Sequence, residues 1–174
     1  MPWVITSSDA DRRGRGPVLA AAAGRGLLGG LAGAAAMTAS QRLERAVTGR
    51  RASHVPGRTL LLLAGRSPGE DDQPGAATLT MVVATSAALG ALRGVWRASG
   101  LVRVRADVAQ TLARIIVDQT LENATGAGAP PRAWRGGEGV VEVLHAAVAA
   151  VATGAVVERL VEPVLESRRG AASH

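Results

Sequence analysis

Glu142 and His145 are the residues whose types and spacing most resemble a chemical site, because they form a Glu-x-x-His pair. In four-helix proteins that bind two iron or manganese ions, two such pairs act together with two further carboxylates. This chain has one pair, since neither His54 nor His174 has such a partner. We therefore predict no metal site. We interpret the pair as part of a polar stripe that faces partner helices, made of Glu138, Glu142, His145 and Thr153.

The same pair gains a second interpretation when it is taken with the acidic residues Asp118 and Glu122. Ionisable groups at membrane depth are costly and tend to mark ion or proton paths. Asp118, Glu142 and His145 are therefore candidate intramembrane polar residues, and a small channel or carrier is one alternative function. The other interpretation places these groups at helix ends, in the headgroup zone or in water.

A glycine-rich stretch, Gly24-Arg-Gly-Leu-Leu-Gly29, spells the G-x-G-x-x-G pattern of dinucleotide-binding loops. That fingerprint requires a preceding strand and a following βαβ series, whereas "PVLAAAA" is Ala-rich and no such series follows. The stretch instead contains two overlapping G-x-x-x-G pairs, formed by Gly26, Gly29, Gly30 and Gly33. Such pairs let another helix approach closely in lipid, so we predict that these four glycines are helix-packing residues.

Catalytic and cofactor motifs are missing from the sequence. There is no G-x-S-x-G nucleophile elbow, and the absence of Lys excludes a P-loop. The absence of Cys excludes disulfides, thiolate metal sites and Cys nucleophiles. We predict a protein that is not an enzyme and has no cofactor.

The composition points to lipid as the surroundings of the chain. Of its 174 residues, 47% are hydrophobic but only 2% are aromatic, and 22 are Gly. Small residues favour helix association in lipid, whereas water-soluble cores rely on large aromatics. The net charge of +6 is not accompanied by aromatics interleaved with Arg, so nucleic acid is not an expected partner. The expected partners are the bilayer and, through small-residue helix faces, a second copy or another membrane protein.

The hydropathy pattern predicts four helices, at about 18–47, 76–98, 101–123 and 138–162, between polar tails at 1–16 and 164–174. The first tail is expected to be disordered. The segment 48–75 is predicted to be a loop with one short apolar turn at 60–63.

The second helix carries the longest uncharged run, from Gln73 to Leu92, which is close to the roughly 20 residues that cross a bilayer core. Arg93, Trp96 and Arg97 close this run, and Trp96 and Trp134 are predicted interfacial anchors. The uncharged stretches of the first and last helices are shorter than a full span, which favours snorkelling flanks or a thinned bilayer.

The third helix is amphipathic, with polar residues recurring every three or four positions. Arg103 and Asp107, and Arg114 and Asp118, are spaced to pair along its polar face. Such a helix lies on a membrane surface, or it crosses the membrane with its polar stripe turned inward.

A resemblance to a known group is carried by two segments, "RGLLGGLAGAAAMTASQRLERAVTGRRASHVPG" and "APPRAWRGGEGVVEVLHAAVAAVATGAV". The chain resembles uncharacterised small multi-spanning membrane proteins of high-GC Gram-positive bacteria. That resemblance implies about four membrane helices and no assigned activity. The single His145 and the charged third helix depart from the group's pattern.

These observations predict an all-α membrane bundle of three to four antiparallel helices in a multi-pass protein of the cell membrane. Its expected function is non-catalytic, with a structural or partner-binding role. Besides the channel or carrier, one further alternative is a soluble or peripheral Ala-rich helical bundle that binds an anionic surface.

Overall fold

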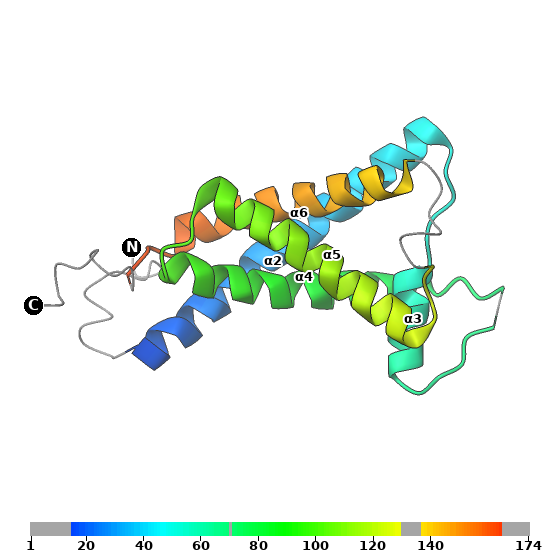
Figure 1. Cartoon of the computed structure of the whole chain (residues 1–174), viewed down its shortest axis with the longest axis horizontal. Helices are drawn as coiled ribbons and strands as arrows, with labels where there is room; N and C mark the ends of the chain where they lie inside the picture. The colour runs from blue at the N-terminus through cyan, green and yellow to red at the C-terminus, as the bar shows by residue number, and fades with distance from the viewer. Residues whose placement is uncertain (1–14, 70, 130–136, 165–174) are drawn as a thin grey trace, which may run out of the picture.

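The computed structural model describes residues 15–69, 71–129 and 137–164, and within them it contains helices and no strand (Figure 1). This arrangement confirms the predicted all-α class. The helices are α2 (Arg15–Thr48), α3 (Val55–Leu63), α4 (Gly75–Ala98), α5 (Arg103–Thr125) and α6 (Glu138–Leu160).

The segment 48–75 is predicted from the sequence to be a loop with one short apolar turn at 60–63, but the structure has a longer ordered element there, the helix α3 at Val55–Leu63. Pro56 lies in the first turn, where a missing backbone N–H costs the helix nothing. Gly57 rests against α4, where an added Cβ would lie 2.5 Å from Thr78 Oγ1. Contact with α4 thus favours a helix in a segment whose Gly, Pro and charge content is typical of a loop.

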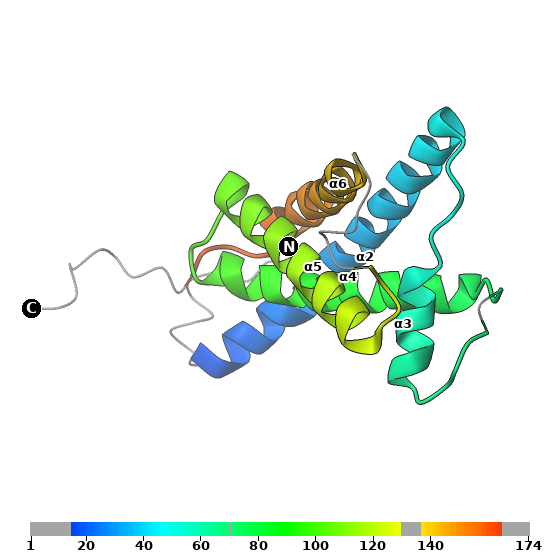
Figure 2. The same ribbon diagram turned by 45° about the vertical axis from the view of Figure 1, so that its right-hand side comes forward.

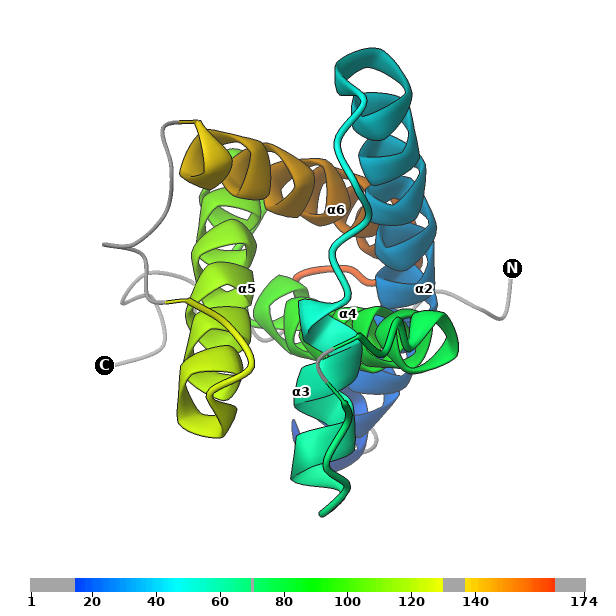
Figure 3. The ribbon, with the colours of Figure 1, turned by 90° about the vertical axis from the view of Figure 1, so that its right-hand side faces the viewer.

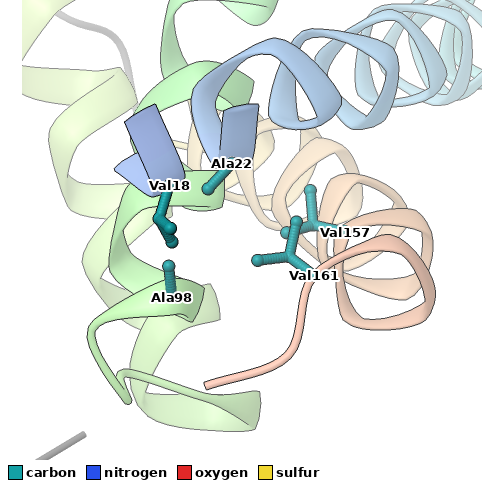
Figure 4. Packing of buried hydrophobic residues seen from close by; sticks show 5 residues of the cluster. All are labelled: Val18, Ala22, Ala98, Val157 and Val161. Carbon is teal, nitrogen blue, oxygen red and sulfur yellow. The ribbon is translucent and has the colours of Figure 1, made fainter. Parts of the chain in front are cut away.

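The two ends of the described chain lie at the same end of the molecule. Val18 and Ala22 at the start of α2 form one buried cluster with Ala98 at the end of α4, and with Val157 and Val161 at the end of α6 (Figure 4). Helix α2 is therefore antiparallel to both α4 and α6. Helix α5 starts at the end of the molecule where α4 and α6 end, and it runs back toward the end that carries α3 (Figure 1).

The four long helices follow the length of the molecule with marked tilts, and the short α3 stands across them at the end away from the termini (Figure 2). Seen along that length, α2 and α4 lie on one side and α5 lies on the other, with α6 bridging from α5 to α2 (Figure 3).

Three helices are long and apolar enough to cross a membrane, namely α2, α4 and α6. Helix α5 does not belong to this set, since charged residues recur along it. The described chain is therefore compatible with at least three membrane spans.

Candidate functional site

The closest helix crossing lies between α2 and α4 and depends on glycine in both helices. A Cβ added at Gly26 would lie 2.2 Å from the carbonyl oxygen of Gly90. A Cβ at Gly30 would lie 2.2 Å from the carbonyl oxygen of Ser86, and one at Gly94 would lie 2.0 Å from that of Ala22. No side chain fits in these positions, so the two backbones touch directly.

Gly29 and Gly33 face a different helix, α6. A Cβ at Gly29 would meet the Val157 side chain at 2.5 Å, and one at Gly33 would meet Thr153 Oγ1 at 2.2 Å. The four predicted packing glycines therefore serve two crossings at once. Because α4 and α6 cover them, they leave no glycine groove on α2 for a second protein.

A buried arginine joins α4, α5 and α6 near the end of the molecule where Val18 and Val161 cluster. Arg93 is only 1% exposed, and its Nη2 lies 2.7 Å from Asp107 Oδ1 and 3.7 Å from Glu158 Oε1. Its Nη1 donates to Gln110 Oε1 at 3.4 Å. Gly154 of α6 provides the room, since a Cβ there would lie 2.5 Å from Arg93 Nη2.

A second buried arginine, Arg114 of α5, lies further along the interior. Its Nη1 donates to Ser86 Oγ of α4 at 2.8 Å, and its Nε donates to Asp118 one turn later. Arg114 is 5% exposed, so both partners contribute to satisfying a charge that is almost cut off from the surroundings. Asp118 is thus placed inside the molecule as an ion-pair partner.

Helix α5 buries polar residues of its middle turns and exposes several of its large apolar residues, although Arg103 and Arg105 at its start are also exposed. Ala106, Gln110 and Arg114 are buried, whereas Ile116 is 63% exposed. The other exposed apolar residues of this helix are Val104, Val108 and Leu112. This orientation is the reverse of the one that an amphipathic helix takes in a water-soluble protein.

The rest of the molecule follows the same pattern. Its largest fully buried side chain is that of Arg93, and most other buried residues are Ala, Gly, Val, Ser or Thr. Larger aliphatic side chains point outward on the other long helices, including Leu27, Leu28, Leu31, Leu79, Leu92, Val140, Leu144 and Val151.

A cavity of about 540 Å³ lies where α3, the end of α2 and the start of α6 meet α4 and α5. Its apolar wall includes Met37, Met81 and Val82, which are buried. Its charged lining is divided between elements. All arginines except Arg114 of α5 come from the end of α2 and the following loop, whereas carboxylates come mainly from α5 and α6. The charged lining residues are Arg42, Arg45, Arg50, Arg51, Arg114, Glu44, Asp118, Glu122, Glu138 and Glu142.

The three predicted intramembrane polar residues all line this cavity. His145 is buried, and its Nδ1 lies 2.8 Å from Ser40 Oγ of α2. Glu142 forms no hydrogen bond or salt bridge with any described residue. Across the described residues, no three His, Cys, Asp or Glu side chains form a group that could hold a metal ion.

The predicted anchors have different outcomes. Trp96 is half-buried in the last turn of α4, next to Arg97, whose Nε donates to the carbonyl oxygen of Val161 at 2.9 Å. Trp134 lies outside the described residues. The predicted tails at 1–16 and 164–174 also fall largely outside them, although Arg15 and Gly16 already belong to α2.

Sequence reasoning missed two features of the interior. Arg93 was assigned to the end of a span, but the structure buries it against Asp107. Gly90 and Gly94 form a G-x-x-x-G pair that was readable in the sequence and matches the one on α2.

No protein-family model matches the chain, and no curated protein or solved structure matches it either.

Proposed function

We propose that the chain is a multi-pass integral membrane protein of the cell membrane, with a non-catalytic, structural role, and that the bilayer is its main partner. The observation that carries this proposal is the orientation of α5, whose large apolar residues Val108, Leu112 and Ile116 point outward while Gln110 and Arg114 point inward. In water this orientation would expose apolar surface and bury charge, and both changes are unfavourable. In lipid both become favourable.

The three apolar helices support the same conclusion, and α5 adds a fourth crossing under this proposal. Because Asp107 and Asp118 pair with Arg93 and Arg114, the middle turns of the helix can lie in hydrocarbon with these charges neutralised. Four antiparallel crossings also agree with the resemblance to small multi-spanning membrane proteins of high-GC Gram-positive bacteria, to which we propose the chain is related.

The non-catalytic part of the proposal is supported by how the interior charges are used. Arg93 bridges α4 to α5 and α6, and Arg114 bridges α4 to α5. The residues that pair with these two arginines therefore have a role in holding helices together, and no catalytic role is needed to account for them. A partner protein would have to bind elsewhere than the glycines of α2, since α4 and α6 already cover them.

Washing isolated membranes with alkaline carbonate tests the proposal against a soluble or peripheral bundle. We expect the protein to stay in the membrane pellet and to leave it only when detergent is added. Recovery in the carbonate supernatant, or a monodisperse protein in buffer without detergent, would contradict membrane integration.

The channel or carrier alternative is favoured by one observation, namely that Asp118, Glu142 and His145 share a cavity. Ion flux into vesicles that contain the purified protein tests it. The alternative predicts flux above that of empty vesicles, and it predicts that Asp118→Asn changes that flux. A background rate for the unsubstituted protein would eliminate it.

A further inference from the structure

We propose that the cavity near α3 binds a small zwitterion, with its ammonium group against Glu122 and Glu142 and its anionic group toward the arginines at the end of α2. A primary ammonium and an anion joined by a short linker occur both in the phosphoethanolamine headgroup of a lipid and in free soluble zwitterions. The cavity of about 540 Å³ falls within the usual range of ligand sites, roughly 300–1,000 Å³.

Two carboxylates of the lining are available to a cation. The carboxylate of Glu122 accepts only a long contact from Gln119 Nε2, at 3.5 Å, and forms no salt bridge with a described residue. Glu142 has neither a hydrogen bond nor a salt bridge in the described chain. Asp118 differs from both because Arg114 already neutralises it.

Three arginines are available to an anion. Arg50 is paired with Glu44 at 3.6 Å, but Arg42, Arg45 and Arg51 form no salt bridge with the described residues. Arg45 uses only Nε internally, to donate to the carbonyl oxygen of Gln41 at 3.1 Å. Its two terminal nitrogens keep donors for an oxyanion.

Unsatisfied buried atoms point independently to a missing hydrogen-bonding partner. Gln119 Oε1 and His54 Nδ1 are buried and have no partner in the structure, and both residues line the cavity. An unmade hydrogen bond of this kind costs about 1–3 kcal/mol. An ammonium has three donors, which matches the acceptors that Glu122, Glu142 and Gln119 offer.

The charges around the cavity favour a zwitterion over a plain cation or a plain anion. A plain cation would leave Arg42, Arg45 and Arg51 unpaired at the same cavity, and a plain anion would lie beside Glu122 and Glu142. A molecule that carries both charges satisfies both groups. The apolar wall of Met37, Met81 and Val82 suits the methylenes that join the two charges.

Calorimetric titration of the purified full chain in detergent tests this proposal without depending on the membrane assignment. The probes are free phosphoethanolamine, a short-chain phosphatidylethanolamine, the matching phosphatidylglycerol, and the separate halves ethanolamine and inorganic phosphate. We expect phosphoethanolamine, free or on the lipid, to bind at least tenfold more tightly than either half or than phosphatidylglycerol, because two charge-assisted contacts replace one.

Matched variants locate the site. Glu142→Gln and Arg45→Gln should each weaken binding about tenfold, the loss expected for one charge-assisted hydrogen bond. Glu162→Gln and Arg105→Gln change the same residue types on exposed positions near the other end of the molecule and should leave binding unchanged. Unfolding curves of all four variants check that the cavity variants keep their fold, and Glu142→Asp should retain part of the affinity.

The results separate the sources and the competing interpretations. Binding by the lipid alone assigns a lipid headgroup, and equal binding of free phosphoethanolamine assigns a soluble zwitterion. The proposal is overturned if neither form binds, if one half binds as tightly as the whole, or if the cavity variants bind like the controls. Carbonate extraction reports separately on the membrane assignment, so the two proposals can fail independently.

Discussion

At the residue scale, the interior depends on side chains that are either very small or charged and paired. Gly26 and Gly30 bring α2 into backbone contact with α4, and Gly29 and Gly33 make room for the Val157 and Thr153 side chains of α6. The buried arginines, Arg93 and Arg114, are each held by a carboxylate, and Met37, Met81 and Leu89 are the large apolar side chains that are buried. Dispersion at close helix approach and satisfied charge therefore replace the large aliphatic core of a water-soluble protein.

Glycine substitutions on α2 should separate packing from helix propensity. Gly30→Ala places a methyl group 2.2 Å from the carbonyl oxygen of Ser86, so it should destabilise the fold by about 1–3 kcal/mol through overpacking. Gly24→Ala is the matched control, because nothing lies within 4 Å of its added Cβ. The control should be neutral or stabilise the helix by up to about 1 kcal/mol. The measurement is unfolding in detergent followed by circular dichroism, and equal stability of the two variants would contradict the close crossing.

At the element scale, α5 is held to its neighbours by polar contacts. Asp107 and Gln110 reach Arg93 of α4, and Arg114 reaches Ser86 of the same helix. The amide of Arg103, at the start of α5, donates to Glu158 Oε1 of α6 at 2.8 Å. Apolar residues of α5 lie on its outer face, so hydrophobic burial inside the molecule contributes little to its position.

Removing one partner of the Arg93–Asp107 ion pair should therefore lower the stability of the fold more than replacing both partners with uncharged residues. Asp107→Ala leaves the buried Arg93 with only the longer contacts to Glu158 and Gln110, and it should destabilise the fold by about 3–5 kcal/mol. Adding Arg93→Met should recover part of that loss, because no bare charge remains. The free energies of unfolding of the two single variants and the double variant complete a double-mutant cycle. A double variant as unstable as the sum of the single variants would contradict a direct pairing.

At the scale of the whole molecule, the proposed four crossings fix which connections share a side of the membrane. The turn between α4 and α5 lies at the end where Val18 and Val161 cluster, whereas α3 and the end of α5 lie at the other. The chain contains no Cys, so single cysteines can report on each connection without background labelling.

Accessibility of single cysteines tests this topology. Ser67→Cys and Ala124→Cys should react with a membrane-impermeant maleimide from one side, and Ser99→Cys should react only from the other, because α4 and α5 each cross once. All three positions are exposed in the structure. Intact cells and inverted vesicles provide the two sides. If Ser99 and Ala124 are labelled from the same side, α5 lies on the membrane surface and the chain crosses three times.

The sequence by itself determined the fold class, because small residues, long apolar runs and turn residues act locally along each helix. Four long helices, the amphipathic period of α5 and the glycine pairs on α2 are all readable from residue spacing. The sequence also singled out Asp118, Glu142 and His145, which the structure places around one cavity.

Only the tertiary structure decided how these elements use their residues. Periodicity shows that α5 has two faces, but it does not show which face points inward, since that depends on Arg93 and Ser86 in another helix. The helical state of α3 depends in the same way on the contact of Gly57 with Thr78. Such contacts join residues far apart in the chain, and their free energy has no counterpart in local spacing.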